Sequence, residues 1–509
     1  MVSPLVLIIS LLCFRVSLNA QVFLNGALVH SNSNSLIYVQ TDSLIINGES
    51  YFLQEGELYI DKDLIILDGN LNIDGLVDVE GNILNNDSLV GLSASSEIHL
   101  KGNWTNNQFF SAGLNSTYLD GNVQLISGSA VSNFYNLINL GSLLDVKRLV
   151  GVNSIVLNQL DLGDVEFATD GHTLTVLNPN INAILRNNGF VSSIDSGRLE
   201  RLVNSTQPYL FPTGSSLGVL RYRPIEIRPT TNLVDTFGVR LANVNATNEG
   251  YDVLKLSDSL CAVNPSFYHR IYGNTEADIS MFYLPQEDGN WDAMAQWQML
   301  DEWDKLPQEI NSNAGQFSSL RINAWSNFEE NAFALGIQKP YLDLVDTLQV
   351  DLGQSLLLSP TYVGANPSQV LWFPFDEIAC PNCLETEIEP SISQYYNLEI
   401  SVNQHCRIVD SVLILVNPGS LFLPTGFSPN SDGVNDLFYP LNNNLDYYLI
   451  KIFNRWGELV YFGNELGSAW DGTYKGRNAE IGVYSFYSEY RFKNNTAVES
   501  LNGNVTLIR

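Results

Sequence analysis

The first two hundred residues alternate short apolar runs with glycine, asparagine and aspartate, a pattern that predicts β-strands joined by tight turns. The 3.6-residue period of a helix is not evident there. Gly69, Gly75 and Gly81 lie six residues apart, and six-residue spacing is typical of a parallel β-helix. Residues 21–208 are therefore predicted to form a right-handed β-solenoid, with an all-antiparallel β-sandwich as the alternative.

From residue 209 the runs lengthen and aromatic residues become more frequent. Phe237–Leu241, Ser280–Tyr283 and Ala332–Leu335 predict strands, so residues 209–338 are expected to form a β-sandwich. The tryptophans of this segment fit either stacking against sugar rings or, more commonly, burial in a β core. They are Trp291, Trp297, Trp303 and Trp325.

Residues 339–417 repeat the strand pattern on a smaller scale. Val370–Trp372 has the composition of a buried strand, and Tyr396–Val402 alternates apolar and polar positions. A tryptophan on one strand with cysteines nearby suggests an Ig-like sandwich, in which a disulfide closes a loop or crosses the sheets.

The last segment, residues 418–509, predicts a small β-sandwich. Leu449–Phe453 and Glu458–Phe462 are β-rich runs separated by the turn residues Asn454–Gly457, which predicts a hairpin. In a later strand four aromatic residues fall on one face and predict a half-buried strand. They are Tyr484, Phe486, Tyr490 and Phe492.

Three dense motifs lie in this segment: Phe427–Phe438, Ile452–Tyr461 and Trp470–Gly476. Together with Gly482-Val-Tyr484 and the closing Gly503–Arg509, they resemble the type B C-terminal sorting domain of the type IX secretion system, also described as the gliding motility-associated C-terminal domain. Ser431 stands where the family often has glycine. The matching positions are Phe427, Pro429, Asn430, Asp432, Gly433, Asn435, Asp436, Asn454, Arg455, Trp456, Gly457, Trp470, Asp471, Gly472, Gly476, Gly482 and Tyr484.

The resemblance implies that the tail is an address without chemistry of its own, recognised by the outer-membrane secretion machinery of a Gram-negative bacterium. The protein would pass through the periplasm and end at the outer cell surface or in the medium. Residues 339–417, with Cys380-Pro-Asn-Cys383 and Cys406, resemble the PKD-like or Ig-like modules that precede such tails. A structural disulfide from Cys380 or Cys383 to Cys406 is expected in that module.

Four side chains with oxygen atoms surround Gly433: Asn430, Asp432, Asn435 and Asp436. Oxygen ligands around a glycine turn suggest a calcium loop, which makes calcium the one cofactor that the sequence indicates. The pattern lacks a distant bidentate glutamate. The alternative is that these side chains bond to their own backbone in tight turns.

Charge and the N-terminal residues bear on the partners and the export of the protein. The 55 acidic residues outnumber the 25 basic ones, for a formal net charge of −30, so nucleic acid is excluded as the expected partner because phosphate binding needs a basic face. Residues 1–20 fit a secretory signal peptide, since Leu5–Phe14 is an apolar run and Ala20 is a small residue before a cut ahead of Gln21. The run is too short to span a membrane, and Arg15 interrupts the apolar stretch.

The sequence shows no assembled catalytic signature. The five histidines have no metal-ligand spacing, and neither a His-Glu-x-x-His motif nor a phosphate-binding glycine loop is present. The leading hypothesis is a non-enzymatic adhesin or binding protein, because a solenoid offers a long regular surface to a polymeric ligand such as a polysaccharide. The alternatives are an architectural stalk and a polysaccharide-degrading enzyme that draws paired carboxylates from distant coils of a β-helix.

Overall fold

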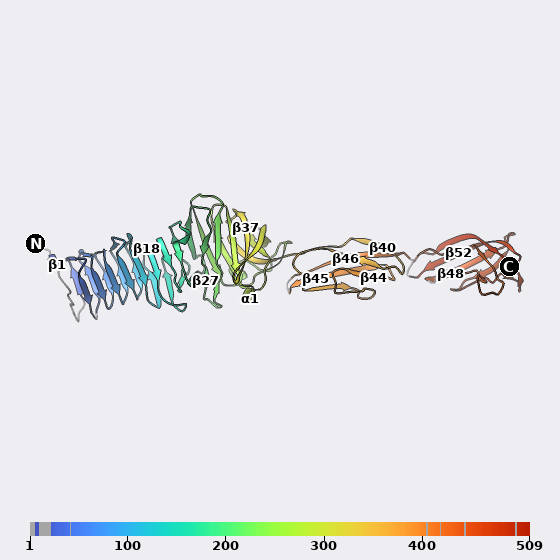
Figure 1. Ribbon diagram of the computed structural model, residues 1–509, viewed down its shortest axis with the longest axis horizontal. Coiled ribbons are helices and arrows are strands. Elements are labelled where there is room, and N and C mark those ends of the chain that lie inside the picture. Colours follow the sequence, from blue (N-terminus) through green and yellow to red (C-terminus); the bar gives the residue numbers. More distant parts are fainter. Residues whose placement is uncertain are drawn as a thin grey trace. The chain divides into compact units, whose positions relative to one another are not determined.

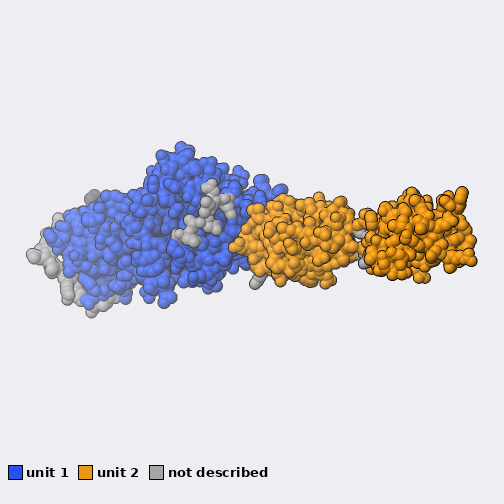
Figure 2. Space-filling view, turned by 45° about the vertical axis from the view of Figure 1, so that its right-hand side comes forward, with its two compact units in different colours: residues 1–339 blue, residues 340–509 orange. Residues whose placement is uncertain are grey.

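The computed structural model describes residues 6–9, 22–40, 42–403, 406–417, 419–441, 444–493 and 496–509. Strands hold 53% of the chain and helices 2%, which confirms the all-β prediction. The chain divides into two compact units, Met1–Lys339 and Pro340–Arg509 (Figure 2). Among the described residues, no helix has the length and apolar composition that a membrane span requires.

The first unit begins with a β-solenoid of about nine turns, whose strands run from blue to cyan in Figure 1. Its first coils each contribute one strand to three parallel sheets. Solenoid sheet 1 contains β1 (Val6–Ile9), β3 (Leu28–Ser31), β6 (Ser50–Gln54), β9 (Gly69–Ile73), β12 (Ser88–Gly91) and β15 (Phe109–Ser111). Solenoid sheet 2 contains β2 (Val22–Asn25), β5 (Leu44–Asn47), β8 (Leu64–Ile66), β11 (Ile83–Asn85), β14 (Trp104–Asn106), β17 (Val123–Ser127), β19 (Val146–Val150), β21 (Glu166–Ala168) and β24 (Phe190–Ser192). Solenoid sheet 3 contains β4 (Leu36–Val39), β7 (Glu57–Ile60), β10 (Leu76–Val79), β13 (Glu97–Leu100), β16 (Ser116–Leu119), β18 (Ser132–Asn139), β20 (Ser154–Asp161), β22 (Thr173–Val176) and β25 (Arg198–Val203).

The parallel pairing explains the six-residue glycine spacing. Gly69 begins β9, Gly75 lies between β9 and β10, and Gly81 lies between β10 and β11, so each interval is one face of one coil. A Cβ at Gly75 would lie 2.0 Å from the carbonyl oxygen of Gly56 in the preceding coil. The corner therefore requires glycine because the backbones of successive coils approach closely there. The antiparallel-sandwich alternative is wrong for this stretch, since its described strands pair in parallel.

Of the predicted signal peptide, residues 1–20, only Val6–Ile9 are among the described residues, where they form β1 and pair with β3. The signal-peptide assignment stays a prediction.

The solenoid interior is largely apolar but also encloses polar side chains. Trp104 is fully buried, packs against Phe110 and Phe134 with ring centroids 4.8 Å and 5.1 Å away, and donates from Nε1 to Ser132 Oγ at 2.9 Å. Lys147 is also fully buried, and its Nζ donates to the carbonyl oxygen of Gly121 and, at 2.8 Å, to Gln124 Oε1. Burial lowers the pKa of Lys147 to about 8.

In solenoid sheet 3, β25 pairs in parallel with β22 and antiparallel with β30 (Asp235–Ala242), so one sheet continues from the solenoid into the following segment. The predicted boundary at 208/209 lies near this change of direction. The sheet goes on through β32 (Tyr268–Tyr272), β38 (Ala332–Gln338), β34 (Ala293–Gln298) and β35 (Glu302–Lys305), with β31 (Leu260–Val263) pairing with β38. A second antiparallel sheet contains β26 (Tyr209–Phe211), β29 (Ile225–Pro229), β33 (Ala277–Tyr283), β37 (Phe317–Trp325) and β36 (Gln308–Ala314).

Trp291, Trp297 and Trp303 are buried in this segment, at 9%, 6% and 0% exposure. Trp297 and Trp303 pack edge to face, with ring centroids 5.6 Å apart. Their faces are therefore not available to sugar rings, and they serve as core residues.

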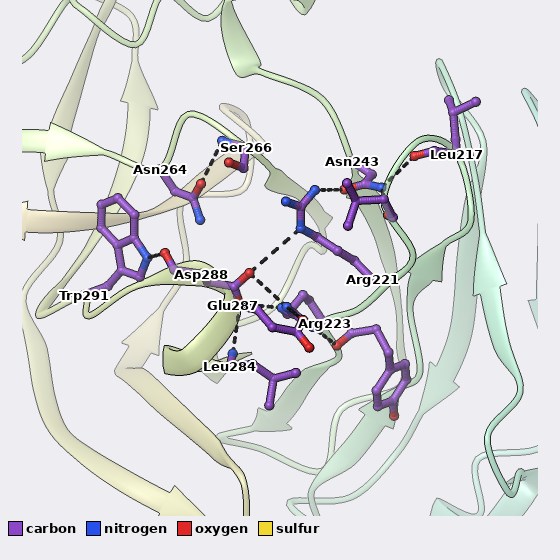
Figure 3. A network of polar contacts seen from close by, with 12 residues as sticks. Leu217, Arg221, Arg223, Asn243, Asn264, Ser266, Leu284, Glu287, Asp288 and Trp291 are labelled. Atoms are coloured by element: carbon purple, nitrogen blue, oxygen red, sulfur yellow. Dashed lines mark hydrogen bonds and ion pairs between the residues drawn. The ribbon is translucent and has the colours of Figure 1, made fainter.

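A buried ion network joins the loops of this segment (Figure 3). Asp288, at the end of the short helix α1 (Pro285–Asp288), accepts two hydrogen bonds from the Arg223 guanidinium at 2.5 Å and 2.8 Å. Both side chains are only 1% exposed. Asp288 also accepts from the backbone N–H of Leu284 at 2.8 Å, and Glu287 accepts from Arg223 at 2.7 Å. His269 is fully buried next to this network, where its Nε2 lies 2.9 Å from the carbonyl oxygen of Arg223, and burial lowers its pKa to about 4.

The second unit begins with strands whose shared core surrounds Trp372, which is fully buried. One sheet has the order β40 (Thr347–Asp351), β46 (Cys406–Asn417), β45 (Gln394–Asn403) and β43 (Gln369–Phe373). Two smaller pairs are β39 (Tyr341–Asp343) with β42 (Thr361–Val363) and β41 (Leu356–Leu358) with β44 (Thr386–Ile388). The PKD-like or Ig-like character of residues 339–417 stays a prediction.

The expected disulfide pairing is wrong. Cys380 and Cys383 are bonded to each other, with their Cα atoms 5.5 Å apart, so neither forms a bridge to Cys406. Residues of this short loop accept from Trp372: the backbone N–H of Trp372 donates to the carbonyl oxygen of Pro381 and its Nε1 to that of Cys383, at 2.8 Å and 2.9 Å. The bond therefore closes the loop that covers the core tryptophan.

Replacing Asp288 with alanine is expected to lower the free energy of unfolding of the first unit by about 3–5 kcal/mol, because the buried charge of Arg223 loses its main partner. Glu80→Ala is the matched control, since Glu80 pairs with Lys101 where both side chains are 48% exposed. It should cost no more than about 1 kcal/mol. Urea denaturation of the full-length variants measures both, and equal losses would contradict the role given to the network.

Lys147→Met is expected to change how stability depends on pH. The folded pKa near 8 lies below the ordinary value of 10.5, so the unfolded chain binds more protons between these values. The wild-type protein should therefore gain stability as pH rises through this window, because Lys147 loses its buried charge. Urea denaturation from pH 7 to pH 10.5 measures the unfolding free energy of both proteins. Tyrosines titrate in the same range in both, so the difference between wild type and variant reports Lys147 alone. A constant difference would contradict the shifted pKa.

Candidate functional site

The last part of the chain is built on a five-stranded sheet with the order β47-β53-β52-β48-β49 and on a separate strand pair, β50-β51. The predicted hairpin is confirmed as β48 and β49, which pair antiparallel around Asn454–Gly457. The predicted aromatic face of β52 is buried, as expected. The strands are β47 (Gly426–Phe427), β48 (Leu445–Phe453), β49 (Leu459–Gly463), β50 (Thr473–Tyr474), β51 (Arg477–Asn478), β52 (Gly482–Phe492) and β53 (Glu499–Leu507).

Aromatic residues from separate motifs meet in the core of this sheet. The Trp470 ring is fully buried, with its centroid 5.3 Å from Phe427 and 4.8 Å from Tyr484. Gly472 has φ +73°, and a Cβ there would lie 2.8 Å from Cγ of Pro429. These motif residues therefore hold the domain together.

The motif residues of the β48–β49 turn have a different environment. The side-chain oxygen of Asn454 accepts from the backbone N–H groups of Trp456 and Glu458, each at 3.0 Å, which fixes the turn. Gly457 takes φ +80°, a left-handed conformation that favours glycine. Trp456, at the tip, is 80% exposed, and the Arg455 guanidinium lies 5.2 Å from its ring centroid. A well-defined turn thus presents an aromatic side chain to solvent.

A pocket of about 430 Å³ lies beside this turn. Its rim carries an ion pair between Arg455 and Glu480, 3.2 Å apart, and the Tyr484 hydroxyl donates to the backbone oxygen of Glu480 at 2.7 Å. Burial raises the pKa of Tyr484. The guanidinium of Arg509 donates to the carbonyl oxygen of Ala479 at 2.9 Å. The pocket is lined by Asn454, Arg455, Trp456, Val460, Tyr474, Asn478, Ala479, Glu480, Ile481, Gly482, Val483 and Tyr484.

Residues 421–507 match the family model described as "CHU_C Type IX secretion signal domain". This segment is a type IX sorting domain. The sorting domain implies export by the type IX system, contact with its secretion machinery, and delivery to the cell surface or the outside. The predicted recognition is thereby confirmed for the tail.

Two further comparisons concern the whole chain. No curated protein matches it. Among solved structures it is similar to the "Crystal structure of dimeric latent PorU from Porphyromonas gingivalis", with 8% identity and a TM-score of 0.14, over 56% of this chain and 31% of that one. The chain thus spans about a third of that protein's length, and a likeness at this level carries no argument about function.

Of the four residues predicted as calcium ligands, Asn430, Asp432 and Asp436 accept with their side chains from backbone N–H groups of their own loop, and Asn435 accepts from the N–H of Ser428 with its backbone carbonyl. The Asp436 carboxylate accepts from the N–H groups of Asn430, Ser431 and Gly433 at 2.9, 2.7 and 2.8 Å. The Asp432 carboxylate accepts from the N–H of Val434 at 2.8 Å, which lowers the pKa of Asp432. This is the arrangement of the backbone-bonding alternative, and the calcium loop stays a prediction.

The remaining sorting-motif residues lie in turns or at the start of a strand. The Asp471 carboxylate accepts from the backbone N–H of Thr473 at 2.9 Å. Gly476 and Asn435 take positive φ of +73° and +54°. Gly482 begins β52. The structure therefore assigns a local structural role to each of these residues.

Other candidate groups do not assemble into a reaction centre. Within the described ranges, no group of three or more His, Cys, Asp or Glu side chains has a metal-binding arrangement. His30 and His99 each pair with a glutamate, and His405 lies outside the described residues. Gly214–Gly218 matches the Gly-x-Ser-x-Gly pattern of a nucleophile elbow, but it joins the antiparallel strands β27 (Gly214–Ser215) and β28 (Arg221–Tyr222). The elbow requires a turn from a strand into a helix.

Asp436→Ala is expected to destabilise the sorting domain by about 1–3 kcal/mol, because three N–H groups lose their acceptor. The loss should be the same in calcium chloride and in EDTA, as followed by thermal unfolding of the full chain. Asp446→Ala is the control, since Asp446 pairs with Arg491 at the surface. If calcium instead stabilises the wild type and fails to stabilise Asp436→Ala, the loop binds calcium.

Proposed function

We propose that this protein is a non-enzymatic binding protein, or adhesin, that the type IX system delivers to the cell surface or to the medium. The sorting domain supports the delivery. The solenoid supports the binding role, because about nine turns provide parallel sheets whose outer positions repeat from coil to coil.

The main support for a binding role is one row of side chains on the solenoid. Across solenoid sheet 3 the strand register aligns five partly exposed residues, one from each of five successive strands. They are Tyr38, Tyr59, Asp78, His99 and Tyr118. Neighbouring strands are about 4.8 Å apart, so the row repeats its groups at that interval along the solenoid.

The row combines aromatic rings with hydrogen-bonding groups. His99 stacks on Tyr118 with centroids 4.3 Å apart, and the Tyr38 hydroxyl donates to Asp61 Oδ1 at 2.7 Å. Further carboxylates lie two residues along the chain from members of the row: Glu57, Glu80, Glu97 and Asp120. A repeating array of phenol and carboxylate oxygens suits a hydroxyl-rich linear polymer, because each sugar offers donors and acceptors at a similar interval. Polysaccharide is therefore the proposed ligand class.

A specific observation also supports the enzymatic alternative. Burial raises the pKa of Asp78, the carboxylate at the centre of the row. A carboxyl group that keeps its proton to higher pH is suited to act as a general acid at a glycosidic bond. A polysaccharide-degrading enzyme with a β-helix catalytic domain is thus the second candidate.

Incubation of the purified protein with a panel of polysaccharides distinguishes a binding protein from a polysaccharide-degrading enzyme. We expect retention on one polysaccharide class without new chain ends, and loss of that retention in the double variant Tyr59→Ala/Tyr118→Ala. Tyr51→Ala is the matched control, because Tyr51 is 41% exposed on solenoid sheet 1. New chain ends that disappear in Asp78→Asn would establish the enzyme, and the absence of both retention and cleavage would contradict the binding role.

A further inference from the structure

Five sorting-motif residues from two separate segments of the sequence line one pocket: Asn454, Arg455, Trp456, Gly482 and Tyr484. Three come from the β48–β49 turn and two from the start of β52. The other motif residues either build the core or shape local turns, and those roles account for them. The pocket is thus a place where motif residues from two separate parts of the tail meet.

Stability does not account for Trp456. It is 80% exposed, whereas the other motif tryptophan, Trp470, is 0% exposed. A tryptophan held in solvent gains little free energy from folding, but it can bury a large apolar area when a partner binds. Tryptophan and arginine are also the residues most enriched among those that dominate binding energy at protein interfaces.

The walls of the pocket indicate what kind of group enters it. Ile481 and Val483 are 63% and 57% exposed, and with Trp456 they give the pocket an apolar side. The Arg455–Glu480 pair on the rim supplies one cation and one anion. Because Asn454 fixes the turn by two hydrogen bonds, the pocket needs little ordering before binding, which favours affinity.

We propose that this pocket is the contact through which the type IX secretion machinery holds the tail, and that its ligand is an extended peptide segment of that machinery. The segment inserts an apolar side chain between Trp456, Ile481 and Val483, while its polar backbone lies against the Arg455–Glu480 pair. This inference rests on the proposed export and adds the residues that make the contact.

The test follows the full-length protein in a type IX-secreting bacterium and measures its amounts in the periplasm and outside the outer membrane by immunoblot. We expect Trp456→Ala and Ile481→Ser to lower the external fraction at least about tenfold and to accumulate in the periplasm. Phe462→Ala is the matched control, because Phe462 is a 49% exposed aromatic residue of β49 that does not line the pocket. It should be exported like the wild type.

Thermal unfolding of the purified variants distinguishes loss of recognition from loss of folding. Trp456→Ala should unfold at the wild-type temperature, since the side chain is largely in solvent. A folded Trp456→Ala protein that is exported as well as the wild type would overturn the proposal. A wild-type protein that stays in the periplasm would instead overturn the export assignment on which the proposal rests.

Discussion

The solenoid depends on backbone hydrogen bonds between successive coils, because an isolated coil cannot pair its own N–H and C=O groups. Leu76 donates from its N–H to the carbonyl oxygen of Gly56, and Glu97 donates to that of Gly75, at 3.0 Å and 2.9 Å. This pairing fixes the register of every strand with its neighbours. It brings backbones into contact at corners such as Gly75, where a side chain would not fit, and stacks inner side chains from coil to coil. The same register aligns the outer residues, so the row proposed to bind a polymer is a direct consequence of it.

The register between coils also determines the partners of polar groups inside the solenoid, such as Asn85 and Lys147. Asn85 donates from Nδ2 to Asn106 Oδ1 in the next coil and to the carbonyl oxygen of Phe109, both at 2.8 Å. Asn85 and Asn106 are register partners, so the buried amide of Asn85 has a partner that the repeat itself supplies. Lys147 also bonds to the equivalent position in the adjacent coil, Gln124, but its side chain is a cation rather than a neutral amide. It relies on a carbonyl and an amide oxygen, and its ammonium therefore pays a desolvation cost that appears as a lowered pKa.

The sequence predicted the features that are local and left out those that depend on register. Gly69, Gly75 and Gly81 indicated the length of one coil face, and the turn at Asn454–Gly457 indicated a hairpin, because both signals lie within a few residues. The row through Asp78 could not be predicted, since strand pairs in sheet 3 such as Val77 with Leu58 and Val77 with Ile98 are offset by different numbers of residues. The disulfide was predicted wrongly because the spacing of cysteines does not show which loop lies next to which strand.

The sorting tail shows why geometry has to be added to a motif. Trp470 and Trp456 stand in neighbouring motifs of similar density, yet one is the centre of the core and the other is exposed on a turn. The tail has its own apolar cluster, distinct from the one around Trp372, so its fold does not depend on the core of the preceding segment. The secretion machinery has to recognise a sorting domain whatever domains precede it in the chain. A self-sufficient core that presents a fixed turn and pocket meets that requirement, because the core carries the stability and leaves the exposed residues free for recognition.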